Sequence, residues 1–295
     1  MTTYGNYVLL TDSNCDLPND FAVECGFDII PMEFIMEDKS YFHYLDAREM
    51  SLEDFYSKLK SGIMSQTVQV NSTRFVETFE PYLKDNKDIL YIAFTSGMSG
   101  TYERAVTASQ ELMEKYPDRK VIVVDSLCAS VGQGILMYYV GNMYKNEMPT
   151  LEELTEYAEK IKLNCCHWFV VDDIDQLKRG GRISSVTATF AKALQIKPVI
   201  SVDNEGKLVN VGKVRGAANV YDALIKKMKR DADDYKNQVI LIGHADNIEG
   251  AKELAKRVKP LVKDTMICDI GPVIGTHVGS GMLAILFMGT RDLSM

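Results

Sequence analysis

The sequence predicts an α/β protein with two domains, an N-terminal parallel, doubly wound sheet and a C-terminal mixed α/β sheet. Three observations support this fold class. The first half of the chain repeats a strand, polar turn and helix pattern three times, which is typical of a parallel sheet with helices on both faces. The second half combines a hairpin with a strand–helix–strand unit, which requires a mixed sheet. The length of 295 residues, with 46% hydrophobic residues, suffices for two domains with their own cores.

The three repeats of the first half place their polar turns at one edge of the predicted sheet. Apolar strands are predicted at 7–10, 89–94 and 121–124, followed by polar residues at 11–13, 95–100 and 125–126. Because right-handed crossovers bring the ends of parallel strands to the same edge, these turns should lie close together. Ligands of open α/β sheets bind at this carboxyl edge.

Two further helices and a loop complete the first half. A helix is predicted at 51–60 with Ser51 as its N-cap, a polar loop at 61–73, and another helix at 150–163. We therefore expect an N-terminal domain at 1–163 and a C-terminal domain at 164–295.

The second half contains the elements of the mixed sheet. A strand is predicted at 168–171 and a hairpin at 198–211 with its turn at 204–206. A strand at 238–243, an amphipathic helix at 248–258 and a strand at 266–270 follow. The segment 271–281 holds four glycines and is interpreted as an open loop.

Composition excludes several classes of protein. The net charge of −8 argues against nucleic acid as a partner, because such proteins carry clustered lysine and arginine. The six cysteines form no CxxC pair, and with only four histidines no zinc-site spacing occurs, so we expect reduced, mostly buried thiols and no metal. We see neither the features of a signal peptide nor an apolar run as long as a membrane span, and we expect a cytoplasmic protein.

The segment 95–102 is the most informative candidate site. It holds three hydroxyls within Thr95 to Ser99 and two glycines, Gly97 and Gly100, at a predicted strand-to-helix turn. Backbone N–H groups at a helix start favour anions, although Ser and Thr there can also simply cap the helix. The spacing matches neither the GxSxG nucleophile elbow nor a Walker loop.

Other candidates are less specific. His277 lies among the glycines of 271–281, where it could donate to a ligand. Arg182 and Arg215 belong to small basic clusters that suit a phosphate, a carboxylate or a partner, or else a solvated face. Ser65 lies in the polar loop, and Ser126 follows the third strand, where capping a helix is the simpler role.

The order of these motifs over nearly the full chain resembles the DegV family, the bacterial fatty-acid-binding proteins that present acyl chains to a fatty acid kinase. The motifs that carry the resemblance are Thr11-Asp12-Ser13, Thr95-Ser96 through Ser99-Gly100-Thr101-Tyr102, Asp125-Ser126, Leu177 to Ile183, Lys197-Pro198, Lys213-Val214-Arg215 and Gly275-Thr276-His277-Val278-Gly279. This resemblance implies two α/β domains enclosing one long-chain fatty acid, with its carboxylate at the domain interface and its tail in an apolar tunnel. It implies no cofactor.

The resemblance also assigns roles to residues. Ser96 and His277 are expected at the fatty acid carboxylate, with Thr95, Gly97 and Ser65 beside them. Behind these we expect Ser99, Thr101 and Ser126, while Arg182 and Arg215 would contact the kinase. The family usually has Thr-Ser-Gln-Pro where this chain has Met64-Ser65-Gln66-Thr67, so the threonine expected at the carboxylate is replaced by Met64.

Two classes of function remain open at this point. The first is a lipid carrier without catalytic activity, in bacterial phospholipid metabolism, with brief membrane contact during lipid exchange. The second is an enzyme, either a serine hydrolase or a small-anion phosphotransferase, that uses Ser96 or Ser99 with His277. The sequence offers no nucleophile elbow, no acidic partner for His277 and no nucleotide loop, all of which favour the carrier.

Overall fold

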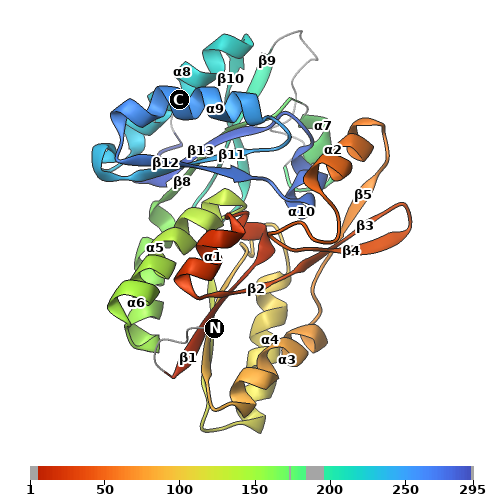
Figure 1. The fold of residues 1–295 in the computed structure, drawn as a ribbon, viewed down its shortest axis with the longest axis vertical. Helices are drawn as coiled ribbons and strands as arrows, with labels where there is room; N and C mark the ends of the chain where they lie inside the picture. The colour runs from red at the N-terminus through yellow and green to blue at the C-terminus, as the bar shows by residue number, and fades with distance from the viewer. Residues whose placement is uncertain (1–5, 173, 184–195, 294–295) are drawn as a thin grey trace.

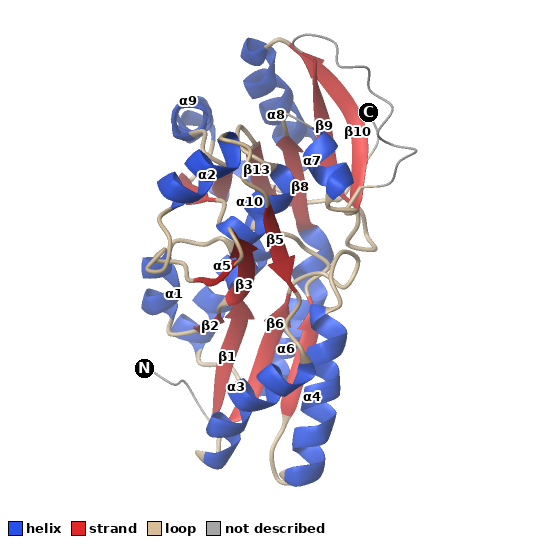
Figure 2. Cartoon of the chain, turned by 90° about the vertical axis from the view of Figure 1, so that its right-hand side faces the viewer, coloured by secondary structure: helices blue, strands red, loops and turns tan. Residues whose placement is uncertain are grey.

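A computed structural model describes residues 6–172, 174–183 and 196–293. These residues form the three sheets of Figures 1 and 2. The strands are β1 (Tyr7–Asp12), β2 (Asp28–Ile30), β3 (Met32–Met36), β4 (Lys39–His43), β5 (Ser65–Val68), β6 (Asp88–Ala93), β7 (Val121–Asp125), β8 (Cys165–Val170), β9 (Ile196–Val202), β10 (Leu208–Arg215), β11 (Val239–His244), β12 (Asp264–Asp269) and β13 (Leu283–Met288). The helices are α1 (Asn19–Cys25), α2 (Leu52–Lys60), α3 (Ser72–Lys84), α4 (Thr101–Lys115), α5 (Val131–Glu147), α6 (Leu151–Ile161), α7 (Ile174–Arg179), α8 (Ala217–Asp231), α9 (Ile248–Val258) and α10 (Pro272–Val278).

The N-terminal sheet is parallel and covered on both faces, as predicted. Its strand order is β2-β1-β6-β7, and every pair is parallel. Helices α3 and α4 pack against one face, whereas α1, α5 and α6 cover the other (Figure 1). The strands are nearly continuous apolar runs because both faces are buried.

The C-terminal sheet is mixed, which confirms the second part of the predicted fold class. Its order is β10-β9-β8-β13-β11-β12, in which only β11 and β12 pair in parallel. The hairpin β9–β10 turns at Gly206, whose φ of 73° suits glycine. Helices α8 and α9 cover the outer face.

Two helices of the first half begin as the sequence predicts. The Ser51 hydroxyl accepts a hydrogen bond from the backbone of Asp54 and caps α2. Thr150 and Glu153 form a capping box at the start of α6, in which each side chain bonds the backbone of the other residue.

Helix α5 joins the two halves of the molecule. It packs against β1 of the first sheet and against β8, β11 and β13 on the inner face of the second. One hydrophobic cluster therefore runs from Tyr7 in the first sheet to Leu286 in the second. A second cluster lies between the C-terminal sheet and helices α8 and α9. The domain boundary after residue 163 stays a prediction.

Two segments that the sequence analysis interpreted as loops are regular structure. Residues Ser65–Val68 form β5, which pairs with β3 in a small antiparallel sheet, β4-β3-β5. Residues Pro272–Val278 form α10, which packs on β3, β5, α2 and α7. The glycine at 275 serves packing here, because a Cβ would lie 2.6 Å from the Tyr56 hydroxyl and 2.8 Å from the Phe55 ring.

Candidate functional site

A cavity of about 360 Å³ lies where the carboxyl edge of the first sheet meets the inner face of the second. Most of its wall is apolar and comes from both halves, including Phe94, Phe169, Val273 and Leu286. Its polar lining consists of Asn14, Thr67, Gln69, Ser96, Ser99, Ser130, His167, Arg182 and His277.

The polar turns that follow β1, β6 and β7 meet at this edge, as predicted. The Asp12 carboxylate accepts a hydrogen bond from the backbone of Phe94 at 2.9 Å. Asp125 accepts one from the backbone of Ser96 at 3.1 Å. These contacts fix the backbone of Ser96, and its side chain forms part of the cavity wall.

Thr95 and Gly97 were expected at the ligand, but the structure places neither on the cavity wall. Thr95 is fully buried, and its hydroxyl donates to the carbonyl oxygen of Gly206 in the β9–β10 turn. A Cβ at Gly97 would lie 2.5 Å from the carbonyl oxygen of Glu205 in the same turn. Both residues therefore hold the two halves together, because the turn at Gly206 is contacted by the Thr95 hydroxyl and closely approached by the backbone of Gly97.

Ser99, Thr101 and Ser126 were expected behind the ligand-binding residues. Ser99 instead lies on the cavity wall, and its hydroxyl is 2.9 Å from that of Thr101. Thr101 is buried at the start of α4, behind Ser99. Ser126 is also buried, and its hydroxyl contacts the backbone of Cys128. Thr101 and Ser126 support the wall, whereas Ser99 belongs to it.

His277 lies in the last turn of α10 and not in an open loop. Its Nε2 is 3.1 Å from the Thr67 hydroxyl, and its buried Nδ1 has no hydrogen-bond partner among the described residues. Burial, together with the nearby charge of Arg182, lowers the pKa of His277 to about 4. The imidazole is therefore neutral at pH 7 in the unliganded protein.

The expected positions of Ser65 and Met64 need correction. The side chain of Met64 is 61% exposed, and Ser65 lies off the cavity wall with its hydroxyl accepting from Thr276. From this strand, Thr67 contributes its hydroxyl to the cavity wall. The side chain of Gln69, just after the end of the strand, also lines the cavity. Thr67-Val68-Gln69-Val70 shares the threonine and glutamine of the Thr-Ser-Gln-Pro pattern, so that pattern matches three residues further along the chain.

Arg182 and Arg215 lie far apart. Arg182 is exposed at the rim of the cavity, next to Ile183, which bridges to Leu208 at the start of β10. Arg215 is the last residue of β10, seven residues further, or about 23 Å along an extended strand. The two arginines therefore do not form one cluster.

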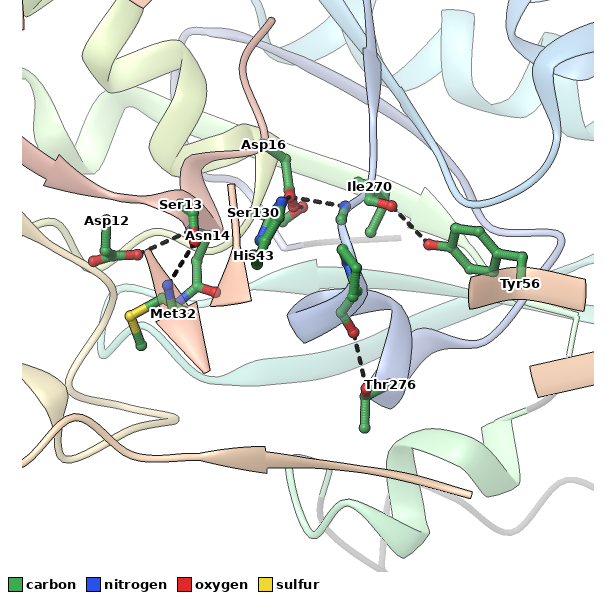
Figure 3. Close-up of polar contacts among 12 residues, drawn as sticks. Asp12, Ser13, Asn14, Asp16, Met32, His43, Tyr56, Ser130, Ile270 and Thr276 are labelled. Atoms are coloured by element: carbon green, nitrogen blue, oxygen red, sulfur yellow. Dashed lines mark hydrogen bonds and ion pairs between the residues drawn. The ribbon is translucent and has the colours of Figure 1, made fainter. Parts of the chain in front are cut away.

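Helix α10 is held in place by buried polar contacts, several of which are drawn in Figure 3. The Asp16 carboxylate accepts from the backbone N–H of Gly271 at 2.9 Å and from the Ser130 hydroxyl at 2.6 Å. The Tyr56 hydroxyl donates to the carbonyl oxygen of Ile270 at 2.8 Å. These residues of the first half fix the helix that carries His277.

Burial governs the protonation of Asp16 and its neighbour His43. Desolvation raises the pKa of Asp16 to about 8, against the opposing effect of its hydrogen bonds from Ser130 and Gly271. Desolvation lowers the pKa of His43, whose Nε2 lies 4.0 Å from Asp16, to about 4. Both directions favour a neutral pair at pH 7.

Five polar residues of the cavity wall were not predicted from the sequence, namely Asn14, Thr67, Gln69, Ser130 and His167. Asn14 follows the strand predicted at 7–10, so its position at the carboxyl edge of the sheet could have identified it as a candidate ligand-binding residue. His167 immediately precedes the strand predicted at 168–171 and lies within the observed β8, where its Nε2 accepts from the backbone of Ala129. Nothing in the local sequence distinguishes such a histidine from a core residue.

The geometry at His277 bears on the enzymatic alternatives. Its Nε2 contacts Thr67, and the described residues bring no carboxylate within hydrogen-bond distance of its Nδ1. A serine triad needs a histidine between a serine and a carboxylate. In the described ranges, no group of three potential metal ligands was found, and no helix is long and apolar enough to cross a membrane.

Comparison with known proteins agrees with the fold. A family model described as an uncharacterised protein of the DegV family matches residues 6–290. A DegV domain-containing protein of Clostridium perfringens is 41% identical over 96% of this chain and 97% of its own length.

Solved structures are similar over the same extent. A structure described as a DegV lipid binding protein from Thermotoga maritima has a TM-score of 0.83 and 28% identity, covering 97% of this chain and all of the other. The structure of DegV, a fatty acid binding protein from Bacillus subtilis, has a TM-score of 0.83 and 26% identity, covering 97% and 99%. The family expected from the motifs is thus confirmed, and this chain belongs to the DegV family.

Proposed function

We propose that this protein binds one long-chain fatty acid in the cavity between its two sheets. The observation that carries the proposal is the division of the cavity wall. Hydroxyls of Thr67, Ser96 and Ser99 and the imidazole of His277 supply hydrogen bonds for a carboxylate, and the apolar remainder suits an acyl chain. The relatives described as binding lipid or fatty acid support the same ligand class.

The acyl chain supplies most of the affinity in this proposal. Burying about 14 methylenes at roughly 0.8 kcal/mol each gives about 11 kcal/mol before the costs of association. A hydrogen bond to a charged carboxylate adds only about 1.5–3 kcal/mol. Ser96, Thr67 and His277 therefore orient the ligand and select an acid over a neutral lipid.

The finer role that we propose is presentation of the bound fatty acid to a kinase, as in a FakB-type carrier subunit of a bacterial fatty acid kinase. Arg182 is exposed, lines the same cavity as His277 and is close enough for its charge to lower the pKa of that histidine. In the proposed role, a carboxylate bound at His277 is reached by a phosphoryl donor docked beside Arg182, while the chain stays buried. The carrier itself would perform no chemistry and would need the kinase for acyl-phosphate formation.

Mass spectrometry of the purified protein, native and then denatured, tests the proposal. We expect one fatty acid per chain, released on denaturation and identified by its mass. Substitution of Ser96 by alanine should reduce retention of the lipid, whereas substitution of the surface residue Met64 should not. A protein that carries no fatty acid and takes up none when it is added would contradict the proposal.

A further inference from the structure

We propose that Cys128 and Cys165 form a redox-sensitive site between the two halves of the molecule, where hydrogen peroxide oxidises Cys128 and Cys165 then closes a disulfide. The site is independent of the proposed lipid function, and its test requires no bound fatty acid. All six cysteines are buried and free, as the sequence analysis expected. The surroundings of five raise the pKa of the thiol, whereas those of Cys128 lower it.

The first observation is the set of partners around Arg291. Its guanidinium donates to the backbone carbonyl oxygens of Lys162, Cys165 and Asp203 at 2.8–2.9 Å. Its Nη2 also lies 3.0 Å from the sulfur of Cys128. The carboxylate of Asp203 does not face the guanidinium, because it accepts from backbone N–H groups of the turn that follows. The negative charge that balances this arginine is therefore a thiolate at Cys128.

The protonation of the two cysteines follows from these contacts. Desolvation raises the pKa of the Cys128 thiol, but a hydrogen bond from Cys165, the charge of Arg291 and the nearby His167 outweigh it. The pKa of Cys128 therefore lies well below its usual range. Burial and the neighbouring Cys128 raise the pKa of Cys165 well above that range. One thiolate and one thiol share the site, which is the pair that disulfide chemistry requires.

Both sulfurs lie against the end of α6. The sulfur of Cys128 is 3.5 Å from the carbonyl oxygen of Lys162. The sulfur of Cys165 is 3.8 Å from the carbonyl oxygen of Ile161, the preceding residue. Cys128 belongs to the loop after β7, and Cys165 is the first residue of β8. A disulfide of about 2.0 Å between them would link the loop of the first sheet to the second sheet.

Burial restricts the oxidant to a small molecule. Cys128 is fully buried, so bulky reagents do not reach its sulfur in the native protein. The next residue, Ala129, lines the large cavity together with His167, and its backbone N–H donates to that histidine at 3.2 Å. Cys128 thus lies directly behind the cavity wall. Hydrogen peroxide is little larger than water and can pass this layer during local fluctuations.

The oxidation proceeds in two steps. The thiolate sulfur of Cys128 attacks one oxygen of hydrogen peroxide, the O–O bond breaks, and the departing hydroxide takes up a proton to become water. The sulfur is now a sulfenic acid. The sulfur of Cys165 then attacks it, the S–O bond breaks, and the hydroxyl group leaves as water with the thiol proton. The two cysteines lose two electrons in total, and one hydrogen peroxide becomes two waters.

Peroxide treatment of the full chain, stripped of lipid, tests the proposal. We expect the free thiols counted after denaturation to fall by two from six per chain, and dithiothreitol to restore them. Mass spectrometry should find the peptides of Cys128 and Cys165 linked. Before treatment, the native protein should show the ultraviolet absorbance of one thiolate at pH 7, and Cys128→Ser should abolish it. Absence of that absorbance, or no linked peptides after peroxide, would overturn the proposal.

Variants of the neighbours separate this site from general thiol oxidation. Arg291→Gln should slow the oxidation roughly tenfold, because an ordinary thiol is only about 3% ionised at pH 7, and Arg291→Lys should retain most of the rate. Cys165→Ser should stop the reaction at the sulfenic acid. Cys166→Ser is the matched control, since Cys166 packs in the outer cluster, and it should leave the disulfide unchanged. Loss of the linked peptides in Cys166→Ser but not in Cys165→Ser would refute the assigned pair.

Discussion

The Thr67 hydroxyl lies 3.1 Å from Nε2 of His277, a contact that joins β5 of the small sheet to the last turn of α10. Two residues 210 positions apart thus place a hydroxyl and an imidazole on one wall of the cavity. The imidazole is neutral, so it can act as a donor at only one of its nitrogens. This pair, with Ser96, is the centre of the proposed carboxylate site.

The Thr67→Val variant should weaken fatty acid binding roughly tenfold. Valine has nearly the same shape, so the change removes the hydrogen bonds of the hydroxyl and little packing. Isothermal titration with octadecanoic acid would measure the effect. The Met64→Ala variant is the control, because Met64 is exposed three residues earlier in the chain. An equal loss of affinity in both variants would argue against Thr67 as a ligand-binding residue.

Fatty acid affinity should rise as the pH falls from 7.5 to 5.5. A bound carboxylate favours the imidazolium form, so the pKa of His277 in the complex must lie above its value of about 4 in the free protein. Stability of the free protein should change in the opposite direction, because the unfolded histidine takes up a proton near pH 6.5 and the folded one does not. The His277→Gln variant should lose the pH dependence of affinity, and an unchanged profile would contradict this role.

Much of the site's framework could be predicted from sequence because its signals are local. Three buried strands that each end in small polar residues define the carboxyl edge, and the structure joins them through Asp12 and Asp125. Ser96 follows directly from this pattern. Thr95 and Gly97 have the same local chemistry but contact the distant turn at Gly206, which no local pattern indicates.

The remaining features depend on tertiary packing. The glycine-rich segment 271–281 is typical of a loop, yet it forms α10 because Gly275 packs closely on Tyr56 and because Asp16 binds the N–H of Gly271. The position of Thr67 on a strand could not be predicted, because this strand is stabilised by pairing with β3 and not by an apolar sequence of its own. Such contacts span tens to hundreds of residues and leave little trace in neighbouring sequence.

The Asp16→Asn variant should remove part of the pH dependence of stability. The folded carboxyl keeps its proton up to about pH 8, whereas the unfolded one loses it near pH 4. The native state therefore binds more protons between these values, and stability falls as the pH rises through this interval. Asparagine mimics the protonated form, since its Oδ1 can accept from the N–H of Gly271 and its amide can donate to the Ser130 oxygen once the Ser130 hydroxyl turns its own proton away.

Urea denaturation at pH 5, 7 and 9 would check this prediction. The unfolding free energy of the variant, relative to that of the unmodified protein, should increase with pH by at most about 1.4 kcal/mol per unit and level off above pH 8. A difference that is constant from pH 5 to 9 would mean that Asp16 is ionised in the native protein.

The Gly97→Ala variant should lose about 1–3 kcal/mol of stability, because the added Cβ would lie 2.5 Å from the carbonyl oxygen of Glu205 and one backbone segment must move. Fatty acid affinity should fall as well, since Ser96 moves with the loop. Thermal denaturation and lipid binding together would measure both effects. Ser96→Ala is the matched control and should lose affinity without a comparable loss of stability. If Ser96→Ala lost stability and Gly97→Ala did not, the close contact between residue 97 and Glu205 would not be the cause of the instability.

The Arg182→Ala variant should retain the fatty acid but impair phosphate transfer by the proposed kinase partner. The guanidinium of Arg182 is exposed at the rim of the cavity, where it suits a contact with that kinase. Arg215 lies at the other end of β10 from Leu208, about 23 Å along the strand, so Arg215→Ala should impair transfer independently if the kinase covers both positions. Only Arg182→Ala should also raise the pKa of His277, whose value the Arg182 charge lowers. Acyl-phosphate formation and lipid content, measured on both variants, would check this. Loss of the bound lipid in Arg182→Ala would instead make Arg182 a ligand-binding residue, and normal transfer by both variants would place the kinase contact on another surface.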